Sequence, residues 1–330
     1  MNKGEKTMKF YPKNKKSSLP PDLLNQLSLI RKEKDFQPKE YLKNKSDLIN
    51  KYFKQHGLSS AVIALSGGVD SALTLAILND AKSQKNSPIK KIYPILLPSY
   101  SNGATDQDFA TTLGKNLCSQ LEIEEFKINI EDIQEKLKEK VDETLNISGN
   151  TWAEGQLVAY LRTPIIYYIT SLLSQEKFSG VICGTTNFDE GKYLGYFGKA
   201  SDGLVDLQII SDLHKSEVFT LGNYLKLPSE ILNRVPQGDM YDGRSDEEVF
   251  GASYDFVELY LNFLSWPKSK QLYFMENLNN ENLKFFKEKQ KNIEDLHRYN
   301  KHKYLGASPA VHLDIFNLSI PNGWRTFNYE

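Results

Sequence analysis

The stretch from Ser66 to Ser71, which reads Ser-Gly-Gly-Val-Asp-Ser, constrains the fold of this chain more than any other feature. The apolar run Ala61–Leu65 precedes it and predicts a buried strand, and the apolar residues 72–78 predict the first turns of a helix. A strand, a glycine-rich turn and a helix N-terminus form an anion site, because the free N–H groups and the helix dipole favour negative charge. The two glycines let the backbone approach a phosphate without a Cβ atom in the way.

Asp70 makes this prediction more specific, because a carboxylate placed directly beside a phosphate would repel it. A Mg²⁺ ion between the carboxylate and the phosphate oxygens removes the repulsion. The hydroxyls of Ser66 and Ser71 add hydrogen-bond donors. The stretch therefore predicts a magnesium–pyrophosphate site. The alternative interpretation is a strand-to-helix turn in which the glycines serve the backbone geometry only.

The composition excludes several classes of protein. The chain has 330 residues, 40% of them hydrophobic, which is enough for one large domain or two small ones. A net charge of −1 gives no global signal for nucleic-acid binding. No apolar run approaches the roughly 18 residues of a membrane span, and the N-terminus lacks a hydrophobic signal core. We therefore expect a cytoplasmic protein. Cys118 and Cys183 form no Cys-x-x-Cys pair, so a metal or redox pair of cysteines is not expected.

Helix and strand patterns alternate from about residue 40. Strands are expected at 61–65, 91–97, 123–130 and 180–184, and helices at 40–56, 70–82, 105–119, 131–145 and 154–174, the last one interrupted or kinked near Pro164. This order predicts an α/β protein with a Rossmann-like, doubly wound parallel sheet, whose ligands bind at the carboxyl ends of the strands. Helices at 214–226, 253–264 and 281–299 predict a helical C-terminal part.

The two ends of the chain differ from this pattern. Residues 1–38 are rich in lysine and predict a flexible segment, with a basic arm for nucleic acid as the alternative. Residues 39–305 hold the alternating elements and are expected to form the main domain. Residues 306–330 are expected to be a C-terminal extension of unknown role. Within it, residues 308–320 alternate apolar and polar side chains and predict a strand or an extended arm.

A second group of polar residues follows the strand expected at 180–184. Glu190 is placed to complete a Mg²⁺ shell with Asp70, the alternative being an exposed loop carboxylate. Asp206 lies at the edge of an apolar segment, where an unpaired carboxylate is costly, so it is expected to accept hydrogen bonds from a ligand or a neighbour. Lys215 at a helix start is unfavourable for the helix but suits a site that gathers phosphates.

These motifs resemble a known family. Ser-Gly-Gly-x-Asp-Ser resembles the PP-loop of the ATP pyrophosphatases, which cleave ATP between the α and β phosphates. Further motifs, in the same order, resemble the signature of the bacterial NAD synthetases: Gly184-Thr185, Glu190, Gly195–Lys199, Asp202-Gly203, Asp206, Asp212-Leu213, Lys215, Gly251–Asp255 and His302-Lys303. The resemblance covers roughly residues 40–305. It implies an adenine nucleotide α-hydrolase-like fold and the ATP-dependent amidation of deamido-NAD with ammonia, through a deamido-NAD-adenylate, to NAD, AMP and pyrophosphate.

The resemblance also implies roles for individual residues. The residues implied to bind ATP are Ala64, Leu65, Ser66, Gly67, Gly68, Val69, Asp70, Ser71, Thr185, Lys215 and Gln237. Those implied to bind deamido-NAD are Arg162, Lys199, Asp206, His302 and Lys303. Asp70 and Glu190 are implied to bind Mg²⁺, and Asp70 and Lys215 to act in catalysis. We expect Asp202 to act in catalysis by capturing ammonium, with Asp206 as the alternative.

The chain departs from the family pattern at a few positions and leaves alternatives open. Gln237 stands where the family carries Ser or Thr, and Leu97 where it often carries Arg. The residues before the first expected strand hold no cysteine, so free ammonia is predicted as the nitrogen source, with glutamine supplied through a separate subunit as the alternative. The family implies a homodimer. The competing functions are another PP-loop ligase and a nucleotide-binding protein without turnover.

Overall fold

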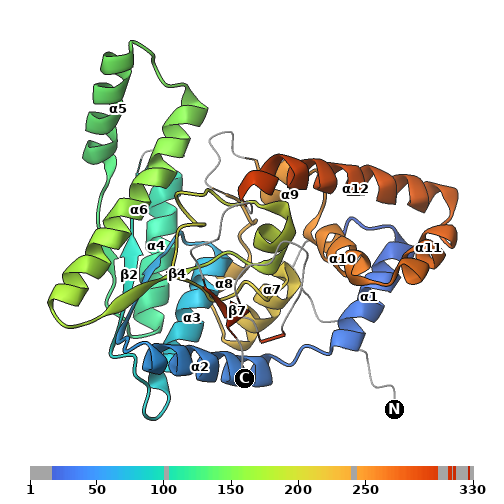
Figure 1. Ribbon diagram of the computed structural model, residues 1–330, viewed down its shortest axis with the longest axis horizontal. Coiled ribbons are helices and arrows are strands. Elements are labelled where there is room, and N and C mark those ends of the chain that lie inside the picture. Colours follow the sequence, from blue (N-terminus) through green and yellow to red (C-terminus); the bar gives the residue numbers. More distant parts are fainter. Residues whose placement is uncertain are drawn as a thin grey trace.

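A parallel β-sheet forms the centre of the protein (Figure 1). The computed structural model describes residues 17–99, 104–238, 244–303, 311–313, 315–316 and 326–327. Within them the sheet has seven strands in the order β3-β2-β1-β4-β5-β6-β7, and all neighbouring strands are parallel. The strands are β1 (Ser60–Ala64), β2 (Lys91–Leu96), β3 (Phe126–Lys127), β4 (Gly180–Gly184), β5 (Leu207–Gln208), β6 (Val311–Leu313) and β7 (Thr326–Phe327).

Helices cover the sheet and form most of the chain between residues 215 and 303 (Figure 1). They are α1 (Pro21–Lys34), α2 (Pro38–Gln55), α3 (Val69–Ser83), α4 (Ala104–Gln120), α5 (Glu131–Leu145), α6 (Thr151–Gln175), the π-helix η1 (Asp189–Leu194), α7 (Lys215–Tyr224), α8 (Ser229–Leu232), α9 (Asp246–Phe250), α10 (Tyr254–Ser265), α11 (Lys268–Glu276), α12 (Asn280–Asn300) and the 3₁₀-helix η2 (Lys301–Lys303). The expected doubly wound α/β fold with a helical C-terminal part is confirmed.

The two faces of the sheet bury separate apolar clusters. Ile63 of β1 packs with side chains of α2, α3, α4 and α7, whereas Val62 packs with Val158 and Ile166 of α6. Successive side chains of a strand point to opposite faces, so a wholly apolar strand requires helices on both sides. This is why the run Ala61–Leu65 is apolar throughout.

The strand order reverses between β1 and β4. Val62 pairs with Tyr93 of β2 on one side and with Ile182 of β4 on the other. The loops that leave the carboxyl ends of β1 and β4 therefore turn to opposite faces and leave a crevice between them, which is where doubly wound sheets bind their ligands. The loop with Ser66–Ser71 follows β1, and the loop with Glu190 follows β4.

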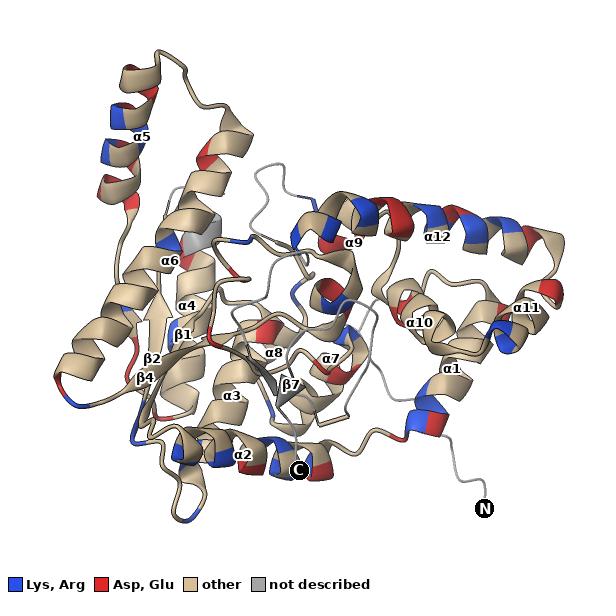
Figure 2. Cartoon of the chain, in the orientation of Figure 1, with Lys and Arg blue, Asp and Glu red and all other residues tan. Residues whose placement is uncertain are grey.

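The expectation of a flexible segment over residues 1–38 is wrong for Pro21–Lys34, which form helix α1. Leu23, Leu27 and Ile30 are buried, and α1 packs against α10. Their spacing of four and three residues places them on one helix face, a periodicity that the surrounding charged residues conceal in the sequence. Residues 1–16 lie outside the described residues. Figure 2 shows charged residues of both signs along α12.

Two further segments differ from the sequence expectation or extend it. The strand expected over 123–130 is limited to Phe126–Lys127, because only Ile95 and Leu96 of β2 pair with it. Part of the alternating segment 308–320 forms β6, which pairs with β5, and β7 pairs with β6 in turn. The rest of that segment, apart from residues 315–316, lies outside the described residues. Helix α6 continues through Pro164 to Gln175.

Candidate active site

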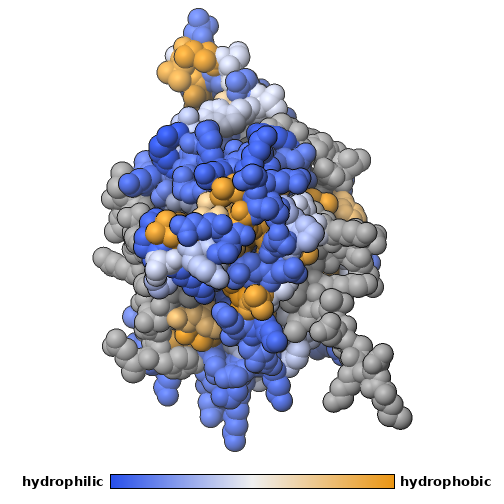
Figure 3. Space-filling view, turned by 90° about the vertical axis from the view of Figure 1, so that its right-hand side faces the viewer, coloured by the Kyte–Doolittle hydropathy of each residue, from blue (hydrophilic) through white to orange (hydrophobic). Residues whose placement is uncertain are grey.

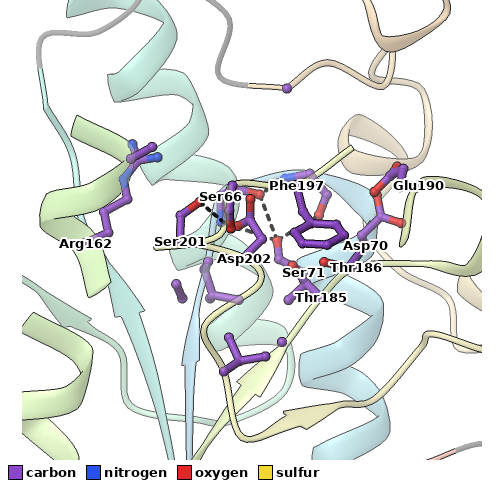
Figure 4. A pocket seen from close by; sticks show the side chains of 18 of the residues that line it. Ser66, Asp70, Ser71, Arg162, Thr185, Thr186, Glu190, Phe197, Ser201 and Asp202 are labelled. Carbon is purple, nitrogen blue, oxygen red and sulfur yellow. Dashed lines mark hydrogen bonds between the residues drawn. The ribbon is translucent and has the colours of Figure 1, made fainter. Parts of the chain in front are cut away.

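A cavity of about 610 Å³ lies at the carboxyl ends of the central strands (Figure 4). Most of the residues implied by the family resemblance line this cavity. They are Ala64, Leu65, Ser66, Gly68, Val69, Asp70, Ser71, Arg162, Thr185, Glu190, Lys199, Asp202, Lys215, Gln237, His302 and Lys303. Gly67 and Asp206 are not among the lining residues.

The loop after β1 is folded around its own two serines. Ser66 Oγ lies 3.1 Å from Ser71 Oγ and accepts the Gly68 N–H at 3.3 Å. Gly68 is the N-cap of α3 and has no side chain to cap it, so the helix N-terminus faces the cavity with donors for an anion. Gly67 has φ +73°, and a Cβ atom there would lie 2.7 Å from the carbonyl oxygen of Ala110 in α4. Gly67 therefore allows the loop to pack closely against α4.

Lys215 joins the carboxylates of the two loops. Its Nζ atom lies 2.6 Å from Asp70 Oδ2 and 2.9 Å from Glu190 Oε1. Burial lowers the pKa of the Lys215 ammonium, but the two carboxylates outweigh burial and the pKa is raised overall, so Lys215 is charged. Asn187, which sequence analysis assigned no role, donates to Asp70 Oδ1 at 2.9 Å and accepts the Glu190 N–H at 3.0 Å. One amide thus holds both carboxylate-bearing segments.

Tyr254 adds a second link that sequence analysis missed. Its hydroxyl lies 2.6 Å from Glu190 Oε1 and 2.7 Å from Asp246 Oδ2. A phenol has one hydrogen to donate, so the second contact needs a hydrogen on one of the two carboxyl groups. Burial raises the pKa of Glu190 to about 7, against the opposing effect of the Lys215 ammonium and with help from Asp70 and Asp246. Glu190 is the group that carries this hydrogen below neutral pH.

This geometry predicts a pH-dependent stability. Because the pKa of Glu190 rises on folding from 4.5 to about 7, the folded protein binds more protons than the unfolded chain between these pH values. The free energy of unfolding of the metal-free protein should therefore fall as pH rises across this window, by at most about 1.4 kcal/mol per pH unit from this group. Urea titrations at pH 5, 6, 7 and 8 measure the slope. The Glu190→Gln variant should show a shallower slope, and equal slopes would contradict the assignment.

The carboxylates of Asp70 and Glu190 fit a Mg²⁺ ion that arrives with a nucleotide. Among the described residues, no group of three or more His, Cys, Asp and Glu side chains is placed to hold a metal by itself. Mg²⁺ usually takes one or two protein carboxylates and completes its shell with substrate phosphates and water. Asp70 and Glu190 contact the same ammonium group, so they are already close enough to share one cation.

The other side of the cavity is cationic. Arg162 of α6, Lys199, and His302 and Lys303 of η2 line it. Lys303 Nζ donates to the carbonyl oxygens of Gly195 at 2.7 Å and Phe197 at 2.6 Å. Burial and the Lys199 ammonium lower the pKa of Lys303 to about 8, against the opposing charge of Asp202. Basic side chains at this end suit a second anionic substrate.

Asp206 is not brought to the cavity. Its Oδ2 atom accepts the Ile182 N–H at 2.7 Å, and its own N–H donates to the Ile182 carbonyl at 3.0 Å. The carboxylate therefore continues the hydrogen bonding between β4 and the segment before β5. The expectation that Asp206 needs a partner holds, and the partner is the neighbouring backbone.

One cavity at the switch point of the sheet holds three features. They are N–H and O–H groups that can donate hydrogen bonds to a phosphate, two carboxylates that fit a divalent ion, and a cationic opposite side. This arrangement is typical of a nucleotide-binding site in a doubly wound α/β protein. Residues 41–306 match the family described as NAD synthase. The chain belongs to the NAD synthase family, which is a family of ligases.

Individual relatives agree with this assignment. The chain is 30% identical over 233 residues to the NH(3)-dependent NAD(+) synthetase of Fusobacterium nucleatum, which covers 70% of this chain and 79% of that protein. It is 32% identical over 210 residues to the enzyme of the same name from Picrophilus torridus, covering 64% and 76%. Among solved structures, the NMN synthetase of Francisella tularensis superposes with a TM-score of 0.63 and 26% identity, covering 81% of this chain and 96% of that one.

Proposed function

We propose that the chain is an ammonia-dependent NAD synthetase. The observation that carries the proposal is the cavity itself, in which the α3 N-terminus, the Asp70–Lys215–Glu190 cluster and the cationic side face one another. In this reaction a nicotinate carboxylate oxygen of deamido-NAD bonds to the α-phosphorus of ATP, and the bond to the β-phosphate bridging oxygen breaks. Ammonia then bonds to the acyl carbon, and the bond to AMP breaks. The products are NAD, AMP and pyrophosphate.

The residues divide between the two substrates. Backbone groups of the Ala64–Ser71 loop, the hydroxyl of Thr185 and the exposed amide of Gln237 bind ATP. Arg162, Lys199, His302 and Lys303 bind deamido-NAD. Asp206, whose Oδ2 atom accepts the Ile182 N–H, supports the cavity wall through β4. The main contribution of the protein is to hold two mutually repelling anions in reactive geometry.

Asp70 and Glu190 hold Mg²⁺, which neutralises charge on the ATP phosphates when it is bound. Lys215 stabilises the negative charge that develops on the departing pyrophosphate. Asn187 and Tyr254 orient the two carboxylates.

Asp202 is the carboxylate that captures ammonium near the acyl carbon. Asp202 lines the cavity and is exposed, and a carboxylate attracts a small cation. Asp202→Asn should raise the KM for ammonium about tenfold, the scale of a lost charge contact of about 1.4 kcal/mol, and leave the KM for ATP within twofold. Steady-state pyrophosphate release at varied ammonium measures this. Full ammonia-dependent turnover in Asp202→Asn would exclude the role.

A second candidate function differs in the acceptor, the substrate that is amidated. The Francisella tularensis neighbour, 26% identical to this chain, is an NMN synthetase, so the mononucleotide of nicotinate is a competing acceptor. Pyrophosphate release from Mg²⁺–ATP should be measured with deamido-NAD and with nicotinate mononucleotide, each with ammonium and with glutamine. A higher kcat/KM with deamido-NAD and ammonium supports the proposal. A higher value with the mononucleotide would reassign the chain, and no release with either acceptor would favour a binding protein without turnover.

We also propose that the chain forms a homodimer through helices α5 and α6. Among the described residues, α5 buries no side chain, and its Ile133, Leu137 and Val141 are exposed at intervals of four. Trp152 and Tyr168 of α6 are each 65% exposed. By contrast, the face turned to the viewer in Figure 3 is mainly hydrophilic, with apolar atoms in small separate areas. A contiguous apolar helix face on a folded protein usually marks an interface.

Helix α6 also raises the question of a membrane. Among the described residues, this helix alone is long and apolar enough to cross a bilayer, and most of it is not buried inside the protein. Arg162 lies in its middle and lines the cavity, which favours a partner protein over lipid. We propose a cytoplasmic location, to which the free, buried Cys118 and Cys183 are suited.

Sedimentation velocity tests the dimer. Leu137→Glu with Tyr168→Glu should give monomers at micromolar concentration, and Tyr273→Glu, a change at the 70% exposed tyrosine of α11, should leave a dimer. A wild-type monomer would contradict the proposal.

A further inference from the structure

Two segments outside the family-matched residues 41–306 meet beside the start of α7. One is the end of α1 with Lys34, and the other is the pair Ile315–Phe316. Lys34 Nζ lies 4.5 Å from the centroid of the Phe316 ring, and that ring stacks on Tyr41 at 5.8 Å. A lysine ammonium over an aromatic face is an attractive contact. The two segments therefore join each other through Lys34 and Phe316.

The first of them anchors the start of α7. Lys34 Nζ lies 2.7 Å from Glu217 Oε1 and donates to Oε2 at 2.9 Å. Glu217 in turn accepts the backbone N–H of His214 at 2.9 Å, which is the carboxylate half of a capping box. His214 is the N-cap of α7, and Lys215 is its first residue. Lys34 thus holds the carboxylate that fixes the backbone immediately before Lys215.

The second segment anchors the chain just upstream. Asp212 is fully buried and forms an ion pair with Lys45, which is buried as well. Its Oδ1 accepts the Tyr41 hydroxyl at 2.7 Å, and its Oδ2 accepts the Ile315 N–H at 3.0 Å. Ile315 thus reaches into the buried centre that fixes Asp212, three residues before Lys215. A buried carboxylate needs every one of these donors, so the contact is specific.

We propose that these two segments act together as a brace, defined by Lys34, Ile315 and Phe316, that positions Lys215 through the segment Asp212–Glu217. Lys34 and Phe316 are positioning residues, since they touch Lys215 only through Glu217, Asp212 and the backbone. The lysine side chain has four rotatable bonds, so its ammonium stays between Asp70 and Glu190 only when its backbone is fixed. The catalytic consequence rests on the proposed function, but the brace itself does not.

The test combines hydrogen–deuterium exchange with turnover, using the full chain. Lys34→Met should speed amide exchange in peptides covering 212–217 at least fivefold and lower kcat for pyrophosphate release about tenfold, the scale of a small misplacement of a catalytic group. Phe316→Ala should change the exchange rate and kcat in the same directions to a smaller extent. In the double variant of Lys34→Met and Phe316→Ala, each fold-change should be smaller than the product of the two single-variant fold-changes. Lys34→Arg should restore both values. Lys32→Met, an exposed position on the same helix, is the matched control and should behave as wild type.

Each outcome decides the proposal. Wild-type exchange over 212–217 in both Lys34→Met and Phe316→Ala would overturn the brace. Faster exchange spread evenly over the protein would overturn it too, because that reports general destabilisation. If Lys34→Met does not fold, Phe316→Ala decides, since that side chain is 36% exposed and its loss is tolerable. If the wild-type protein shows no turnover, the proposed function fails, and the exchange result still decides the brace.

Discussion

Lys215→Met should lower kcat for pyrophosphate release by about a hundredfold to a thousandfold, the loss expected when one preorganised charge is removed from the reacting phosphates. The Lys215 ammonium is the group that both Asp70 and Glu190 contact, at 2.6 and 2.9 Å. Without it, their charges face each other across the site, and bound ATP adds more negative charge. The defect should appear in kcat more than in the KM for ATP, because the charge on pyrophosphate grows in the transition state.

Steady-state and single-turnover measurements of pyrophosphate release separate these effects. Lys268→Met is the matched control, because Lys268 is also the first residue of a helix and is exposed. Lys215→Arg should recover little activity, since a planar guanidinium does not fit between two carboxylates placed around an ammonium. A Lys215→Met enzyme with more than a tenth of wild-type kcat would rule out the stabilising role.

Asp70→Asn should reduce turnover on a similar scale, roughly a thousandfold, while the protein stays folded. The amide keeps the shape of the side chain but removes the charge that binds Mg²⁺ beside the phosphates. Asp70 lies in the first turn of α3 at the cavity and has no packing role in the apolar clusters. Asp80→Asn on the same helix is the control. It also removes one carboxylate charge, and the amide oxygen can still accept the hydrogen bond that Asp80 accepts from Ser46.

A second readout distinguishes lost metal binding from lost fold. Calorimetric titration with a non-cleavable ATP analogue should show that Mg²⁺ strengthens binding to wild-type protein at least tenfold more than to Asp70→Asn. Circular dichroism and the unfolding midpoint should change little. An Asp70→Asn enzyme that turns over at the wild-type rate would remove the case for a carboxylate that bridges metal and phosphate.

The central fold is predictable because its signals are local. The apolar run before Ser66, the two glycines and the apolar residues after Asp70 define a strand, a turn and a helix without reference to the rest of the chain. The parallel arrangement then brings Asp70 and Glu190 together, since both follow the carboxyl ends of neighbouring strands. For this reason a long-range pair of site residues could be predicted from short motifs.

The remaining site contacts depend on tertiary packing and have no such signal. Tyr254 reaches Glu190 from α10, and nothing in its own neighbourhood in the sequence shows which carboxylate it will meet. For Asp206 the cost of burial predicts a partner, but the choice between a ligand and the Ile182 backbone depends on strand spacing. The contact of Asn187 with the Glu190 N–H could have been predicted, because an Asn three residues before Glu190 at a helix start is a capping pattern.

Strands β6 and β7 have a consequence for how the protein reaches its folded state. Without them, β5 would be the last strand of the sheet, and its N–H and C=O groups would be open to pairing with another chain. β6 lies far downstream of β5 in the sequence, beyond all of the C-terminal helices. During synthesis the open edge persists until β6 emerges from the ribosome, so aggregation of the nascent chain competes with folding over that interval.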